Sequence, residues 1–180
     1  MTRVITTEDG QTNGRIGEIV ARRIGRPPRP IEEPARPRTG VAILTCMDAR
    51  LDVYGILGLT EGDAHVIRNA GAMVTDDVRV ALAVSQHLLG SREILVMHHL
   101  DCAMRRVHDH ELAATVQCES GRRPPWRFTT ASDPLARLDE AVRLLAGDPY
   151  LPHTEAVCGY LYDERTDALD EVCRSARRVR

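Results

Sequence analysis

Two short apolar runs, VAILTC over residues 41–46 and EILVMH over residues 93–98, constrain the fold of this chain most strongly. Each has the length of a strand, and neither alternates apolar with polar residues. That pattern is typical of a strand buried on both faces in a parallel sheet. AHVIR (64–68) and AVCGYLY (156–162) predict two further strands, and residues 168–172 predict a short last one.

Helical segments are expected between these strands, over residues 52–59, 109–119 and 134–146, and again after Thr75. Thr75 has the character of an N-cap, and Gly90 sits where a helix commonly ends. Strands that alternate with helices predict an α/β fold with three layers, α/β/α, around a central and mostly parallel sheet.

The N-terminal region differs from the rest of the chain. It predicts a short helix over residues 14–23 and then carries prolines that exclude a continuous helix or a central strand, namely Pro27, Pro28, Pro30, Pro34 and Pro37. Residues 1–39 are therefore interpreted as an arm, which is either a flexible tail or a segment that packs on a partner subunit. Residues 40–180 are predicted to form one domain, since the whole chain is too short for two ordinary ones.

Composition excludes several classes of protein. The formal net charge is −2 and aromatic residues make up 3%, so nucleic acid is not an expected partner. No apolar run approaches the ~20 residues that span a bilayer, so no membrane partner is expected. The N-terminus lacks the apolar segment of a secretory signal, which favours a cytoplasmic location. Five cysteines in such a chain are not expected to form a disulfide framework.

Candidate metal ligands follow two of the predicted strands. The first strand runs into CMDAR (46–50) and the third into HHLDC (98–102). The carboxyl ends of parallel strands share one edge of a sheet, and neighbouring strands lie about 4.8 Å apart. Cys46 can therefore approach His99 and Cys102 if the two strands are neighbours. Two thiolates and one imidazole suit Zn²⁺, and three protein ligands leave a fourth position for water. The alternative is two core cysteines and a hydrogen-bonded core histidine.

The remaining cysteines and histidines receive weaker assignments. Three cysteines lack a paired spacing and are expected to be core or surface thiols: Cys118, Cys158 and Cys173. Strand alternation points His98 away from His99, so we expect His98 to pack and not to bind metal. Four histidines are candidates for a proton relay or are ordinary surface residues: His65, His87, His108 and His110. Asp101 is a possible acceptor for an arginine.

C-x-D-x-R over residues 46–50 together with H-x-x-C over residues 99–102 resembles the β-carbonic anhydrase family. The flanking segments resemble one bacterial branch, which includes carbonyl sulfide hydrolase-like members: CMDARLDVYGILGL, GDAHVIRNAGAMVTDD, SREILVMHHLDCAM and PHTEAVCGYLYD. The resemblance covers residues 40–173, and the first 39 residues match poorly.

The resemblance implies that Cys46, His99 and Cys102 bind zinc and that Asp48 and Arg50 form a catalytic dyad beside the ion. When the aspartate pairs with the arginine, the fourth zinc position is open to water. In some family members the aspartate occupies that position instead. The family is built from dimers with active sites at the subunit interface, so a homodimer or a dimer of dimers is expected.

The resemblance also implies a substrate pocket formed by the family's R-N-A-G turn and the residue after the last ligand, here Asn69, Ala70, Gly71 and Ala103. The chain departs from the family pattern at Ala103 and at Ala72, where glycine is usual, and at Leu100, which replaces a threonine. These changes predict a tighter and more apolar pocket.

The predicted function is carbonate dehydratase activity. Zn²⁺ lowers the pKa of water from 15.7 to about 7, and the hydroxide so formed attacks CO₂ to give bicarbonate. Asp48 would orient the hydroxide, and Arg50 would keep Asp48 ionised through a bidentate pair. One alternative keeps the zinc site and hydrolyses carbonyl sulfide or carbon disulfide. Another is a zinc-bearing scaffold without turnover. A redox protein is disfavoured because the chain has no C-x-x-C.

Overall fold

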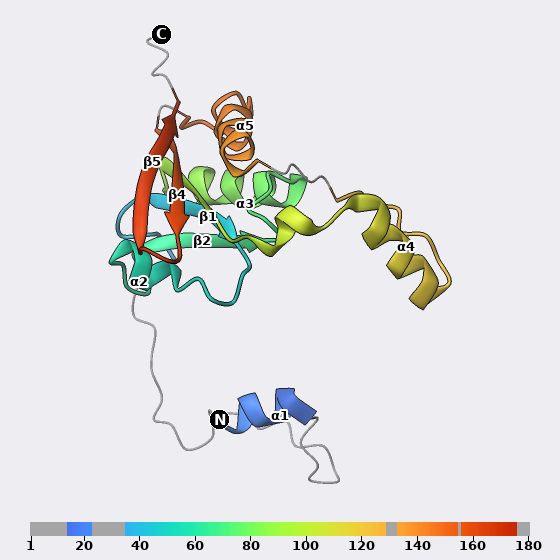
Figure 1. The fold of residues 1–180 in the computed structure, drawn as a ribbon. Coiled ribbons are helices and arrows are strands. Elements are labelled where there is room, and N and C mark those ends of the chain that lie inside the picture. Colours follow the sequence, from blue (N-terminus) through green and yellow to red (C-terminus); the bar gives the residue numbers. More distant parts are fainter. Residues whose placement is uncertain (1–13, 23–34, 129–132, 155, 176–180) are drawn as a thin grey trace. The chain divides into compact units, whose positions relative to one another are not determined.

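The computed structural model describes residues 14–22, 35–128, 133–154 and 156–175. The chain divides into two units, residues 1–32 and residues 33–180 (Figure 1). In the first unit the structure describes helix α1, Gly14–Ala21, where a short helix is predicted. Much of the proline-rich segment lies outside the described residues. The division into an arm over 1–39 and a domain over 40–180 stays a prediction.

The second unit contains one sheet of five strands, ordered β2-β1-β3-β4-β5. The strands are β1 (Val41–Cys46), β2 (Ala64–Asn69), β3 (Glu93–His99), β4 (Val157–Asp163) and β5 (Ala168–Arg174). β2, β1, β3 and β4 are parallel to one another, and β5 is antiparallel to β4. The prediction of a mostly parallel sheet is confirmed.

The helices begin and end close to their predicted bounds. They are α2 (Val53–Leu57), α3 (Asp76–His87), α4 (Asp109–Ser120) and α5 (Pro134–Ala146), and a 3₁₀ helix η1 (Ala103–Arg106) precedes α4. Thr75 caps α3 as predicted, because its hydroxyl accepts a hydrogen bond from the Val78 amide at 3.4 Å. Asp133 caps α5 in the same way, with proline in the first turn. None of the described helices is long and apolar enough to cross a membrane.

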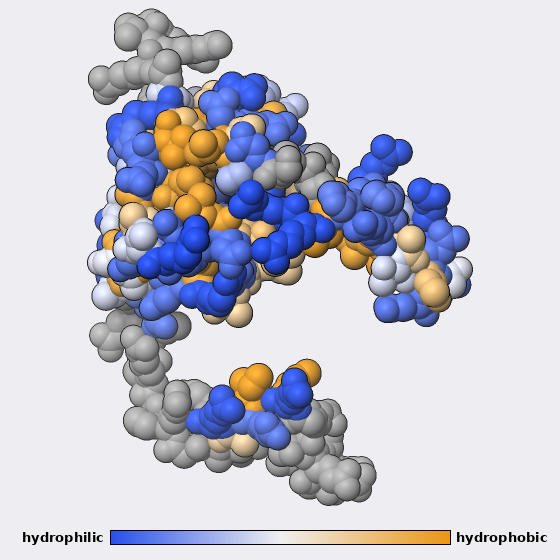
Figure 2. Space-filling model, viewed as in Figure 1, coloured by the Kyte–Doolittle hydropathy of each residue, from blue (hydrophilic) through white to orange (hydrophobic). Residues whose placement is uncertain are grey.

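Side chains from the two faces of the sheet enter two separate parts of the core. Helices α3 and α5 pack on one face, around Leu44, Leu82, Val96, Leu138 and Leu145. The short helix α2 packs on the other face, with Val53 against Ile43 and Met97. Figure 2 shows apolar surface where α5 lies beside β4 and β5. The three predicted layers are therefore present, with a thin helical layer on the α2 side.

The strand order decides what meets at the carboxyl edge of the sheet. β1 and β3 are direct neighbours, with Thr45 opposite Met97, so the segments that follow them leave the sheet side by side. β4 lies on the other side of β3, with His99 opposite Tyr162. The turn after β4 therefore also reaches this edge.

Candidate metal centre

The two strand ends bring together the three predicted ligands. The Sγ atoms of Cys46 and Cys102 are 3.8 Å apart. One ligand atom from each of Cys46, His99 and Cys102 can be chosen so that all three lie within 4.8 Å of one another. All three residues are buried, with 2%, 1% and 8% of their surface exposed.

The chemical nature of these donor atoms fits a zinc ion. Nε2 of His99 is buried and makes no hydrogen bond to any residue that the structure describes, which is costly unless a ligand satisfies it. Two thiols and an imidazole are the donors that tetrahedral zinc prefers. Beside them lies a cavity of about 10 Å³, close to the 10–15 Å³ that one water molecule needs. Its lining residues are Cys46, Gly71, Ala72, His98, His99, Cys102, Arg105, Pro134 and Arg137.

The pKa values of the two neighbouring thiols shift in opposite directions. A hydrogen bond from Cys102 is the main cause that lowers the pKa of Cys46 far below its ordinary value, and His99 adds to it. The hydrogen bond with Cys46, together with burial, raises the pKa of Cys102. The surroundings therefore favour the thiolate form of Cys46. Thiolate is the form of cysteine that binds metal.

Glu164, in the turn between β4 and β5, holds the other side of the imidazole. A hydrogen bond joins Nδ1 of His99 to Oε1 of Glu164. The Asp101 amide donates to both oxygens of the same carboxylate, at 3.2 Å each. Burial works to lower the pKa of His99, but Cys46 and Glu164 outweigh burial and raise it.

Asp48 and Arg50 form the predicted pair at the mouth of the site. The guanidinium binds the carboxylate in a bidentate manner, Nε to Oδ1 at 3.0 Å and Nη2 to Oδ2 at 2.8 Å. This contact holds the pKa of Asp48 well below its usual range. Arg50 also donates through Nη1 to Oδ2 of Asp101 at 2.9 Å, and through Nη2 to the Asp101 carbonyl at 2.9 Å. The arginine thus ties the loop after β1 to the loop after β3.

Arg68 and Asn69 shape the loop that carries this pair. Arg68 donates to three carbonyls of the loop after β1, those of Cys46, Asp48 and Leu51, at 2.6–3.2 Å. The Asn69 side chain both donates to and accepts from the backbone of Met73, at 2.8 Å each. The R-N-A-G turn therefore braces the site from the side of β2.

The predicted substrate-pocket residues do not all line the small cavity. Gly71 does, with a φ of 78°, and a Cβ there would lie 2.6 Å from Nη2 of Arg137. Asn69, Ala70 and Ala103 are not among its described lining residues. Ala103 begins η1 and does not have a positive φ, so its backbone does not require glycine. Ala72 has a positive φ of 54°, a backbone conformation that favours glycine.

His98 is buried beside residues of α5. It lines a second cavity of about 270 Å³ with Arg137 and Glu140, and burial lowers its pKa to about 4. The four predicted relay candidates lie elsewhere. His65 bonds the Ser85 hydroxyl and the Ala35 carbonyl, and His87 contacts the Tyr150 carbonyl. The His108 and His110 rings stack at the start of α4.

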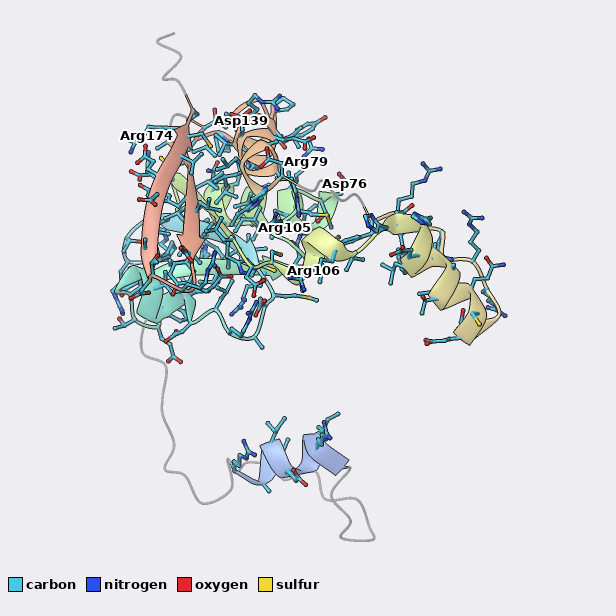
Figure 3. The ribbon with its side chains drawn as sticks, viewed as in Figure 1. Asp76, Arg79, Arg105, Arg106, Asp139 and Arg174 are labelled. Carbon is cyan, nitrogen blue, oxygen red and sulfur yellow. The ribbon has the colours of Figure 1, made fainter. Side chains whose placement is uncertain are left out.

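Three residues near the ligands received no role from the sequence: Glu164, Arg105 and Arg137. Arg105 lies on η1 (Figure 3), lines the small cavity and donates to the Leu100 carbonyl at 2.8 Å. Glu164 follows a predicted strand, so the rule on carboxyl ends of strands would have selected it had the strand order been known. No comparable sequence signal points to Arg137, which reaches the site from a helix.

Comparisons with known proteins agree with this geometry. Residues 41–120 match the family model described as carbonic anhydrase. Beta-carbonic anhydrase 1 of Mycobacterium tuberculosis is 44% identical over 139 residues, which cover 77% of this chain and 85% of the relative. A carbon disulfide hydrolase of Acidianus is 30% identical, covering 71% of this chain and 74% of the relative. The crystal structure of a carbonic anhydrase from Streptococcus mutans has a TM-score of 0.75 at 37% identity, covering 81% of this chain and 88% of that one.

Proposed function

Because this chain belongs to the β-carbonic anhydrase family, we propose that it catalyses the reversible hydration of CO₂ to bicarbonate. The observation that carries the proposal is the cluster of two thiols and one imidazole, with ligand atoms within 4.8 Å of one another at the carboxyl edge of the sheet. Three protein donors suit a catalytic zinc site, whereas a structural site would need a fourth.

Cys46, His99 and Cys102 would hold the ion. Once bound, zinc supplies hydroxide at neutral pH, because it lowers the pKa of water from 15.7 to about 7. Cys46 and His99 are the last residues of β1 and β3, and Cys102 follows β3 by three positions, so the two neighbouring strands position all three donors. The cavity beside them has room for one small molecule at most.

Asp48 and Arg50 would prepare the reacting oxygen. Asp48 stays ionised because of its bidentate contact with Arg50, so it acts only as an acceptor for a proton on that oxygen. Arg50 is itself held by Asp101, which fixes the position of the pair. Since both guanidinium edges are occupied, this arrangement favours the form in which Asp48 leaves the zinc position open to substrate.

A second candidate is hydrolysis of carbonyl sulfide or carbon disulfide on the same ligands. The 30% identical relative named as a carbon disulfide hydrolase favours it. Leu100 and Ala72 also make the surroundings of the ligands more apolar than the family pattern does. Parallel turnover measurements on CO₂, carbonyl sulfide and carbon disulfide separate the two activities, and the substrate with the highest kcat/KM decides.

Stopped-flow hydration of CO₂ by zinc-loaded protein tests the proposal, with Cys46→Ala as the control. We expect rapid hydration by the parent protein and the rate of buffer alone with the variant. Equal rates for both proteins would contradict an enzymatic role and favour a scaffold without turnover. X-ray absorption at the zinc edge would show two sulfur ligands, one nitrogen and one oxygen.

We further propose a cytoplasmic homodimer or dimer of dimers, in which residues 1–39 contact the partner subunit. All five cysteines are free, which suits a reducing compartment. Sedimentation equilibrium of the full chain, beside a chain that starts at residue 40, tests the assembly. A full chain that sediments as a monomer would contradict it.

A further inference from the structure

We propose that Glu164 is a positioning residue for the metal centre: it binds Nδ1 of His99 and so directs Nε2 toward zinc. The inference rests on the proposed zinc site. It adds to that site a residue from the turn between β4 and β5, outside the segments that carry the three donors. Metal-bound histidines usually use their second nitrogen in this way, and the partner group affects metal affinity.

The position of Glu164 follows from the register of the sheet. β3 and β4 are parallel, and His99 lies opposite Tyr162 in this pair. The chain continues past the end of β3 through a hydrogen bond from the Leu100 amide to the Tyr162 carbonyl at 3.0 Å. Glu164 therefore lies beside Asp101, and its carboxylate accepts a hydrogen bond from the Asp101 amide.

The turn that carries Glu164 is braced on both sides. Oδ1 of Asp163 accepts the Arg165 amide at 2.9 Å. The Tyr162 hydroxyl donates to Oδ1 of Asp167 at 2.8 Å. The Glu164 side chain is 16% exposed, and its carboxylate is oriented by the Asp101 amide. A carboxylate that is held in this way presents a fixed acceptor to the imidazole.

The hydrogen bond also selects one tautomer of His99. An ionised carboxylate can only accept, so the proton of the neutral imidazole must lie on Nδ1. The lone pair then lies on Nε2, a buried atom without a hydrogen-bond partner among the described residues. His99 offers its ligand atom within 4.8 Å of those of the two cysteines. Without Glu164, this hydrogen bond would no longer keep the proton off the metal-binding nitrogen.

The test compares zinc affinity in Glu164→Ala, Glu164→Gln and the parent protein, by competition with a chelating dye. We expect the zinc dissociation constant of Glu164→Ala to rise about 10–100-fold. Glu164→Gln should lose less, because its amide oxygen still accepts from Nδ1. Glu119→Gln, an exposed position on α4, is the matched control and should bind zinc like the parent.

Two further readouts separate positioning from a loss of folding. In the zinc-loaded parent, two-bond ¹H–¹⁵N spectra should show His99 protonated at Nδ1, and the opposite tautomer would overturn the inference. Cobalt-loaded Glu164→Gln should show shifted visible bands although its unfolding temperature without metal is unchanged. Zinc affinity of Glu164→Ala within twofold of the parent would also overturn it. A parent protein that binds no zinc would instead contradict the proposed function.

Discussion

Two groups of buried polar side chains differ in how completely the protein satisfies them. At the carboxyl edge of the sheet, Nε2 of His99 has no hydrogen-bond partner in the described part of the chain, and the sulfurs of Cys46 and Cys102 contact each other. Between α3 and the loop after α5, both carboxylate oxygens of Asp148 accept hydrogen bonds. Its Oδ2 accepts from Nε of Arg79 at 2.6 Å, and its Oδ1 accepts the Tyr150 amide at 2.9 Å.

The contrast distinguishes a binding site from a structural contact. Folding strongly disfavours unsatisfied polar atoms in the interior, so a cluster that keeps them is suited to an external partner. A carboxylate whose oxygens both have protein partners has no remaining capacity and serves to join two elements. Substitutions in the first group should therefore change metal binding and activity, and substitutions in the second should change stability.

Cys102→Ser should have the largest effect. Serine is nearly the same size but offers a hard oxygen in place of a soft thiolate, which zinc binds far less well. Hydration of CO₂ should fall by about a thousandfold or more, since the ion supplies the hydroxide at neutral pH. The free energy of unfolding of the metal-free protein should change by less than about 1 kcal/mol, because the volume is conserved. Stopped-flow rates and urea unfolding measure the two quantities.

Asp148→Asn should have the opposite effect: it should lower the free energy of unfolding and leave zinc binding unchanged. The amide group cannot hold Arg79 as an anion does, and hydrogen bonds to charged groups contribute roughly 1.5–3 kcal/mol. Because the Arg79 side chain is 40% exposed, we expect a loss of about 2 kcal/mol and unchanged zinc affinity. The matched control is Asp76→Asn, which removes the other carboxylate near Arg79 (Figure 3). Asp76 is 97% exposed, so urea unfolding should show no measurable change.

The smallest expected effect is the change with pH in the stability difference between the parent protein and Asp148→Asn. Burial raises the pKa of Asp148, but Arg79 and the Tyr150 amide outweigh burial and lower it. A carboxyl group with a lowered folded pKa stabilises the protein above its unfolded pKa of about 3.9 and loses that contribution as the pH falls through the folded value. The stability difference between the parent and Asp148→Asn should thus be constant near pH 7 and shrink below about pH 4. A difference that grows on acidification would contradict this assignment.

Local sequence determined the strands and helices and indicated the cluster of thiol and imidazole donors. Continuous apolar runs predicted the strands, Thr75 predicted the start of α3, and the residues after two strands predicted the cluster of Cys46, His99 and Cys102. These predictions succeeded because strand burial, helix capping and ligand chemistry depend on residues close together in the chain. The pairing of Asp48 with Arg50 is local for the same reason.

Only the tertiary structure decided which distant groups complete the site. Strand order placed β4 beside β3 and so brought Glu164 to His99, 65 positions away in the chain. Strand order likewise brought Asp101 to Arg50, and the packing of α5 on the sheet brought Arg137 to the Gly71 carbonyl. Such contacts depend on how strands and helices pack in space, and packing is set by the whole core and by no single segment.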